Sequence, residues 1–242
     1  MKNIVIVGAT SGIGFETAEL FLKNGYSVGT AGRRTELLEP LAAKYPGQCR
    51  IKSIDINDDD AADKLTELIE ELGGMEIYLH VSGIGYNNPK LSAGKEIDTV
   101  KTNGVGFTRM VTAAYRYFES HRGGHIAVIS SIAGVKGLGS APAYSATKRF
   151  QNIYIDALSQ LSRMNKADII FTDIRPGFVD TALLRNGVYP MLMKSGFVAG
   201  KIYEAIISKR RRIVIDWRYR LMVFGWKCIP EWLWERLTIK TK

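Results

Sequence analysis

A tyrosine and a lysine, Tyr144 and Lys148, open and close the run YSATK. In a helix, this spacing places a phenol and an ammonium on one face. A free phenol has a pKa of about 10 and is a poor base at neutral pH, but a neighbouring cation stabilises its phenolate. Ser131 can donate a hydrogen bond to a substrate oxygen, and Asn103 can complete a relay. The four side chains predict proton transfer to or from an oxygen.

The run GATSGIG at residues 8–14 is a second candidate site, because it joins a predicted strand to a predicted helix. Its glycines let the backbone approach a pyrophosphate, and helix-terminal N–H groups point at that anion. A second strand beginning about 20 residues further on completes the context of a dinucleotide site. The residues of this turn expected to bind the cofactor are Gly8, Thr10, Ser11, Gly12, Ile13 and Gly14.

The second predicted strand ends in AGRR at residues 31–34, where an NAD enzyme usually places an acid for the ribose 2′-hydroxyl. No carboxylate stands there. The guanidiniums of Arg33 and Arg34 can instead neutralise and bind a 2′-phosphate, which favours NADP(H) as the cofactor. The alternative is that both arginines are solvated residues at the start of a helix.

Apolar runs alternate with segments of helical period up to about Ile215, which predicts repeated βαβ units. The fold class is therefore α/β: a Rossmann-type, doubly wound, seven-stranded parallel sheet with helices on both faces. Strands are expected near 3–7, 26–31, 49–54, 76–81, 124–130, 167–174 and 212–215. Helices are expected near 12–24, 34–45, 59–72, 95–121, 142–163 and 197–208.

The chain has 242 residues, of which 46% are hydrophobic and 24% charged. This predicts one dinucleotide-binding and catalytic domain over 1–215, with an aromatic and basic extension of the same domain over 216–242. There is no apolar run of about 18 residues and no signal-peptide cleavage site. Cys49 and Cys228 stand far apart, which indicates neither a zinc site nor a redox pair. A cytoplasmic protein without a metal is expected.

The formal net charge of +9 raises the question of polyanionic partners. Much of the excess lies in the carboxy-terminal part, where KRRR at 209–212 precedes further cations. Such a distribution is typical of a solvated basic face rather than a groove. Since no base-reading motif accompanies the charge, nucleic-acid binding is not expected.

In order and spacing, these motifs resemble the short-chain dehydrogenase/reductase family, from Gly8 to about Thr181. The resemblance implies that Tyr144 exchanges the proton, that Lys148 binds the nicotinamide ribose and lowers the tyrosine pKa, and that Ser131 orients the carbonyl. It also implies that Asn103 holds a water connected to Lys148. Further cofactor contacts are implied for Asp55, Ile56, Ser82, Gly83, Tyr144, Lys148, Pro176, Gly177, Val179 and Thr181, with a homodimer or homotetramer packed through the helices near 95–121 and 142–163.

One departure from that family follows the fourth predicted strand, where Asn-Asn-Ala-Gly is common and this chain reads HVSG at 80–83. The change removes two amides that would brace the sheet and the adenosine, but it leaves the four catalytic groups intact. His80 has no Cys, Asp or His at ligand spacing, so it is interpreted as a hydrogen-bonded structural residue rather than a metal ligand.

The substrate is expected among three loops, at 84–93, 132–141 and 181–197, which vary most in such folds. Their apolar side chains predict a hydrophobic ketone or secondary alcohol of lipid, acyl or steroid type. The residues concerned are Ile84, Tyr86, Val135, Leu138, Phe178, Leu183, Leu184, Tyr189, Met191, Leu192 and Met193.

The segment 217–237 contains all four tryptophans, interleaved with cations. Aromatic residues beside Arg and Lys suit a membrane interface, although the segment is too short and too charged to cross a bilayer. The alternative is an arm that covers the substrate cleft or packs on a sister subunit.

Two functions from different classes follow from these observations. The first is an NADP(H)-dependent oxidoreductase that interconverts a ketone and a secondary alcohol. The second is a catalytically silent dinucleotide-binding sensor or scaffold, for which a complete set of Asn103, Ser131, Tyr144 and Lys148 is not needed.

Overall fold

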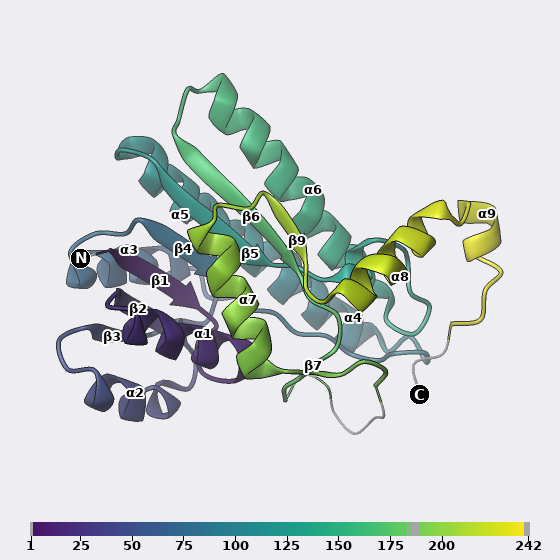
Figure 1. Cartoon of the computed structure of the whole chain (residues 1–242), viewed down its shortest axis with the longest axis horizontal. Coiled ribbons are helices and arrows are strands. Elements are labelled where there is room, and N and C mark those ends of the chain that lie inside the picture. Colours follow the sequence, from purple (N-terminus) through teal and green to yellow (C-terminus); the bar gives the residue numbers. More distant parts are fainter. Residues whose placement is uncertain (1, 183, 185–188, 240–242) are drawn as a thin grey trace.

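A seven-stranded parallel sheet forms the centre of the computed structural model, which describes residues 2–182, 184 and 189–239 (Figure 1). The strands lie in the order β3-β2-β1-β4-β5-β6-β9, and every neighbouring pair is parallel. They are β1 (Asn3–Val7), β2 (Ser27–Gly32), β3 (Cys49–Ser53), β4 (Ile77–His80), β5 (Gly124–Ile129), β6 (Ile169–Arg175) and β9 (Arg212–Val214). The strand order reverses between β1 and β4, the place where such sheets bind ligands.

Helices cover both faces of this sheet, as the alternation along the chain predicts (Figure 1). One core holds α1 (Gly12–Lys23), α7 (Ser195–Ile207) and residues of α2 (Glu39–Lys44) against alternate residues of β1, such as Ile4 and Ile6. The opposite core holds α3 (Ala61–Leu72), α5 (Phe107–Ser120) and α6 (Pro142–Met164) against Val5 and Val7. Burial on both faces explains why the strands are continuously apolar.

The helix expected near 95–121 is instead two helices, α4 (Ala93–Val100) and α5, joined by the π-helical segment η2 (Lys101–Gly106). The helix expected near 34–45 is a 3₁₀ turn, η1 (Thr35–Leu37), followed by α2. Strand ends shift by one or two residues from the expected positions. A further short turn, η3 (Ile132–Gly134), follows β5.

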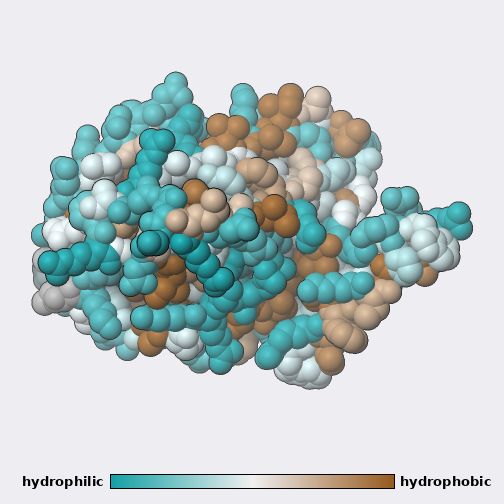
Figure 2. Space-filling model, turned by 90° about the horizontal axis from the view of Figure 1, so that it is seen from above, coloured by the Kyte–Doolittle hydropathy of each residue, from teal (hydrophilic) through white to brown (hydrophobic). Residues whose placement is uncertain are grey.

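Two additions lie beyond the expected elements. A small parallel sheet pairs β7 (Val179–Asp180) with β8 (Met193–Lys194) beside the carboxyl ends of the main strands. Helices α8 (Trp217–Cys228) and α9 (Glu231–Trp234) then form an arm, defined here as residues 217–239, which projects from the body (Figure 1). In Figure 2 this arm, at the right, carries hydrophobic and pale residues next to hydrophilic ones. Within the described residues, no helix is long and apolar enough to cross a membrane.

Candidate active site

The glycine-rich turn after β1 is shaped by close backbone contacts. Gly8 has φ +98°, and a Cβ at this position would lie 2.5 Å from the backbone nitrogen of Ser82. Helix α1 begins at Gly12, and the side chain of its N-cap Ser11 caps no backbone N–H. The first N–H groups of α1 therefore lack a side-chain cap at the crevice outside the carboxyl ends of β1 and β4, and an uncapped helix start is a place where an anion can bind.

The two arginines after β2 lie at the edge of this turn. Arg34 Nη2 lies 3.4 Å from Ser11 Oγ, at the start of α1. Arg33 is largely exposed, and its Nη1 lies 3.8 Å from a carboxylate oxygen of Asp55. Both guanidiniums thus stand beside the crevice, where they can bind a phosphate.

Two of the residues expected to contact the cofactor, Asp55 and Ile56, differ in their surroundings. The Asp55 carboxylate is partly exposed beside Arg33. The Ile56 side chain is buried, its carbonyl accepts a hydrogen bond from Arg109, and a Cβ at Gly106 of η2 would lie 2.8 Å from its Cγ1. Ile56 therefore packs the crevice wall against η2.

Tyr144 is held in place by the start of α6. Pro142 occupies the first turn of this helix, where it loses no hydrogen bond. The Glu96 carboxylate of α4 accepts the N–H of Ala143, 2.8 Å away, and so neutralises part of the positive helix end. A Cβ at Gly85 would lie 2.7 Å from the Tyr144 ring, so the loop after β4 passes directly against the phenol.

Ser131, Tyr144 and Lys148 meet at the carboxyl ends of β4 and β5, as their types and spacing predict. Ser131 and Tyr144 line the same cavity, and the Ser131 hydroxyl is close enough to the phenol to affect its pKa. The Lys148 ammonium lies 5.8 Å from the centroid of the Tyr144 ring. Its Nζ donates to the carbonyl of Ile129 and to Oε1 of Gln151, each at 3.0 Å.

The pKa values of these groups differ from the expected pattern. Burial raises the pKa of Tyr144 above its usual value, and the nearby Ser131 hydroxyl works in the opposite direction. Burial lowers the pKa of Lys148 to about 8, while the negative charge of Asp173 works against that change. The expected lowering of the tyrosine pKa by Lys148 is therefore not seen in the protein alone, because desolvation of the phenolate dominates.

Asn103 lies in the π-helical segment η2, with its side chain buried between α6 and the loop after β4. Its amide group exchanges two hydrogen bonds with the backbone of Ile84 and lies 3.3 Å from Thr147 Oγ1. Its backbone carbonyl accepts a hydrogen bond from Nε2 of Gln151 at 3.0 Å. Gln151 thus connects the backbone carbonyl of Asn103 to Lys148 through its own amide group. The water expected between Asn103 and Lys148 stays a prediction.

Sequence reasoning missed Gln151, although its position three residues after Lys148 places both on one face of α6. It also missed a buried ionic cluster in β6. The Asp173 carboxylate accepts hydrogen bonds from Arg175 at 2.6 and 2.8 Å and from Ser130 at 2.5 Å. Two charges in an apolar strand are the signal for such a cluster, which fixes the end of β5 just before Ser131.

His80 is a buried, hydrogen-bonded residue of β4, as the sequence predicts. Its Nδ1 lies 2.9 Å from the Tyr78 hydroxyl, and its ring packs edge-on against Phe107. Burial, followed by the nearby charge of Lys148, lowers the pKa of His80 to about 3, so it is neutral at pH 7. In the part of the chain that the structure describes, no three His, Cys, Asp or Glu side chains are placed to hold a metal ion.

The loop at residues 176–181, which contains four of the expected cofactor contacts, is held by the arm. A Cβ at Gly177 would collide with the ring of Tyr219 in α8, and the Tyr219 hydroxyl accepts the N–H of Phe178 at 3.0 Å. The same hydroxyl donates to the carbonyl of Pro190. Val179 is buried in β7. A Cβ at Gly12 would lie 2.9 Å from Thr181, so this loop meets the glycine-rich turn.

A cavity of about 590 Å³ extends from Tyr144 and Lys148 to the arm. Five of the apolar residues expected around a substrate line it: Tyr86, Leu138, Phe178, Leu184 and Tyr189. Ile84, Val135, Met191, Leu192 and Met193 do not. Val135 and Met191 pack against the core, Met193 is buried in it, and Leu192 is exposed. Leu183 lies outside the described residues.

The arm completes this cavity. Covering the substrate cleft was one of the alternatives that the sequence left open for this segment. Met222 and Trp226 of α8 line it, together with Ile239. Nε1 of Trp234 donates to the carbonyl of Gly137 at 2.7 Å, and Lys136 binds the carbonyl of Ile229. One face of the arm therefore covers the cleft.

Comparisons with known proteins identify the family of this chain. The family model described as short chain dehydrogenase matches residues 2–188. An uncharacterized oxidoreductase of Mycobacterium tuberculosis is 30% identical, over 98% of this chain and 91% of that protein. Dehydrogenase/reductase SDR family member 7B of Xenopus tropicalis is also 30% identical, over 92% of this chain and 77% of that protein. The chain therefore belongs to the short-chain dehydrogenase/reductase family, whose members are oxidoreductases.

Solved structures share the fold. ElxO with NADP bound superposes with a TM-score of 0.80 at 21% identity, over 91% of this chain and 99% of that chain. A short-chain dehydrogenase from Streptomyces avermitilis gives a TM-score of 0.80 at 21% identity, over 93% and 92% of the two chains. At this identity, the likeness establishes the Rossmann-type architecture.

Proposed function

We propose that this protein is an NADP(H)-dependent oxidoreductase that interconverts a ketone and a secondary alcohol on a hydrophobic substrate. The observation that carries the proposal is the meeting of Ser131, Tyr144 and Lys148 at the inner end of a largely apolar cavity. Acid–base groups at the end of an apolar pocket suit a hydrophobic molecule with one reacting oxygen.

The crevice residues fit a dinucleotide phosphate. The uncapped start of α1 after the glycine-rich turn supports a pyrophosphate site there, and the positions of Arg34 beside Ser11 and of the exposed Arg33 support binding of a 2′-phosphate. We assign the cofactor contacts to the residues named from the sequence, with Lys148 holding the nicotinamide ribose. Bound NADPH would supply a hydride to the carbonyl carbon.

The side chains of this protein would supply the proton. Ser131 would donate a hydrogen bond to the carbonyl oxygen and orient it. The Tyr144 hydroxyl would transfer its proton to the same oxygen, so that a ketone gains one hydride and one proton and becomes an alcohol. The Lys148 ammonium would stabilise the phenolate that remains, because a nearby cation favours the charged form. Asn103 would hold the loop at Ile84 beside the phenol.

The test is a direct assay. NADPH, incubated with the protein and a panel of aliphatic and aromatic ketones, is expected to be oxidised with formation of the matching secondary alcohols. The rival function, a silent dinucleotide sensor or scaffold, is supported instead if NADPH binds and no ketone or alcohol of either class is turned over.

Two further expectations from the sequence remain predictions. One is a cytoplasmic location, and the other is a single catalytic domain over 1–215 that is extended by 216–242.

Cofactor preference can be tested at the two arginines. Because a charge-assisted bond to phosphate contributes about 1.5–3 kcal/mol, Arg33→Ala with Arg34→Ala is expected to weaken NADPH binding about 100-fold or more and NADH binding little. Fluorescence titration measures both. Arg122→Ala, an exposed arginine in the turn after α5, is the matched control. Equal losses for the two cofactors would contradict the assignment of a 2′-phosphate site.

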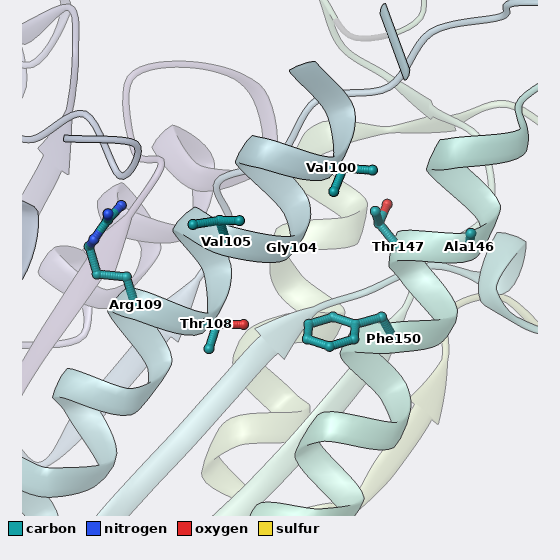
Figure 3. Close-up of a pocket in the computed structure, with 8 residues that line it drawn as sticks. All are labelled: Val100, Gly104, Val105, Thr108, Arg109, Ala146, Thr147 and Phe150. Atoms are coloured by element: carbon teal, nitrogen blue, oxygen red, sulfur yellow. The ribbon is translucent and has the colours of Figure 1, made fainter. Parts of the chain in front are cut away.

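We further propose that a second copy of the chain packs on α4, α5 and α6. An open groove between these helices is lined by Val100, Val105 and Phe150 (Figure 3). Each of these side chains is nearly half exposed, as is Ile153 further along α6. An exposed apolar face of this kind suits an interface between two copies of the chain.

A charge placed in this groove is expected to prevent association. Phe150→Glu should shift the protein from dimer or tetramer toward monomer in size-exclusion chromatography with light scattering, since a buried unpaired carboxylate is costly. Met164→Glu, at the exposed far end of the same helix, should leave the mass unchanged. A wild-type monomer at micromolar concentration would contradict the proposal.

A further inference from the structure

The outer face of α8 is the most exposed apolar surface of the arm. Trp217, Leu221 and Phe224 are 62%, 63% and 69% exposed, and Trp232 of α9 is 60% exposed. The first three are spaced four and three residues apart, so they form one stripe along the helix. The opposite face of the same helix carries Met222 and Trp226, which line the cavity, and the buried Tyr219 and Val223.

Cations flank this stripe. Arg220 and Lys227 are exposed on one side of it, and Arg236 lies 5.5 Å from the ring of the exposed Trp232. Aromatic side chains next to cations are suited to the boundary between lipid acyl chains and headgroups, where the rings enter the apolar layer and the cations meet anionic phosphates.

A second copy of this chain fits this face less well than a lipid surface does. A two-fold contact would bring each patch against itself, and Arg220 and Lys227 of one copy would then approach the same cations of the other. Like charges in such a contact are unfavourable. An anionic lipid surface matches both the apolar stripe and the sign of the charge along α8, whose sequence contains no acidic residue. The exposed acids of this part of the arm, Glu231 and Glu235, lie in and just after α9.

We propose that the outer face of α8 and α9 docks on an anionic phospholipid surface. Only the thickness of one helix, about 10 Å, then separates the lipid layer from the cavity behind Met222 and Trp226. This proposal rests on the proposed function for its second half: the substrate class is an amphipathic lipid whose carbonyl or hydroxyl reaches Tyr144 from that layer.

Vesicle flotation with the full-length protein tests the docking. The wild type is expected to float with vesicles containing about 30% phosphatidylglycerol, and less with pure phosphatidylcholine. The variant Trp217→Ser, Leu221→Ser, Phe224→Ser should bind at least about 100-fold more weakly, since three large side chains no longer enter the lipid. The control Met164→Ser with Ile207→Ser changes exposed apolar residues elsewhere and should bind like the wild type.

Each result has a definite meaning. Melting curves matching the wild type show that the triple variant is folded, and its turnover of a water-soluble ketone should be unchanged because none of its three sites lines the cavity. If the wild type floats with the vesicles but turns over no ketone, the proposed function is contradicted and the docking proposal still holds. Equal flotation of wild type and triple variant, no flotation of the wild type, or a changed oligomeric mass in the triple variant would overturn the docking.

A second inference follows from the contacts of Gln151, which is completely buried. Its Oε1 accepts a hydrogen bond from Lys148 and its Nε2 donates to the carbonyl of Asn103, both at 3.0 Å. We infer that Gln151 is a positioning residue, which fixes the Lys148 ammonium relative to η2. This inference also rests on the proposed function.

Two variants separate positioning from packing. Gln151→Met removes the acceptor and should lower the Lys148 pKa below about 8, while Gln151→Glu adds a carboxylate and should raise it. The other charged or titratable groups near Lys148 are Asp173, whose charge raises its pKa, His80, which is neutral at pH 7, and Tyr144. The alkaline limb of the kcat profile should therefore move in opposite directions in the two variants.

NMR of isotope-labelled lysine measures the pKa of Lys148 without any need for turnover, and the variant Lys148→Met assigns its signal. Opposite shifts in this titration support the inference even if no ketone is reduced. Shifts in one direction, or none, would show that Gln151 only fills space.

Discussion

Replacement of Tyr144 by phenylalanine is expected to lower kcat/KM for ketone reduction by about 10²–10⁴-fold, the range that a positioned acid or base contributes. The phenol lines the cavity together with Ser131 and Lys148. Phenylalanine keeps the ring against Gly85 and removes only the hydroxyl. Affinity for NADPH, measured by fluorescence titration, should change by less than about threefold, because the loss falls on transition-state stabilisation.

A tyrosine on the same helix provides the control. The Tyr154 hydroxyl lies 2.8 Å from Thr112 Oγ1 and away from the cavity, so Tyr154→Phe removes a hydroxyl from α6 without touching the proton path. Its activity should stay close to that of the wild type. If Tyr144→Phe retains full activity, the oxygen receives its proton from another group and the assignment of Tyr144 fails.

The seven-stranded parallel sheet and its helices could be predicted because buried strands and amphipathic helices leave periodic patterns in the sequence. The break in the helix near 95–121 was missed. The sequence KTNGVG of η2 contains two glycines and other residues of low helix propensity, but no proline marks the change to a widened turn. Helix α8 was missed for a different reason. It is apolar on both sides, with Met222 toward the cavity and Phe224 toward solvent, so it has no single stripe.

For the site, motif spacing was enough to bring Ser131, Tyr144 and Lys148 together. Motif spacing could not predict the side chains that pack around these three residues and hold them in place. Gln151 is one glutamine among many polar helix residues until its contacts with Lys148 and Asn103 are seen. Tyr219 lies over 40 residues from the loop that it holds, and no local pattern links them. Long-range contacts of this kind depend on the packed structure.

Acidification from pH 7 to 4.5 is expected to lower the free energy of unfolding by about 5 kcal/mol, through two buried histidines. Burial, and to a smaller extent the charge of Lys148, lowers the pKa of His80 to about 3. Burial, then the charge of Lys209, lowers the pKa of His125 to about 4. Below the unfolded value of about 6.5 the unfolded chain binds these protons and the folded chain does not, so stability falls as the pH falls.

The expected slope is about 1.4 kcal/mol per pH unit for each histidine. Carboxylates with lowered pKa values, such as Glu19 and Asp216, contribute mainly below their unfolded values near 4. Between pH 6.5 and 4.5, the change in the free energy of unfolding therefore comes mainly from the two histidines. Urea unfolding at several pH values measures the slope.

Substitution of one histidine should halve this dependence. His125 Nε2 lies 2.7 Å from Thr172 Oγ1, and glutamine can keep a hydrogen bond there without titrating. His125→Gln is therefore expected to lose about half of the slope and to keep ketone reduction, since His125 lies at the amino end of β5, away from the cavity. An unchanged slope in this variant would mean that His125 takes up its proton in the folded state, and that water reaches its ring despite the surrounding core.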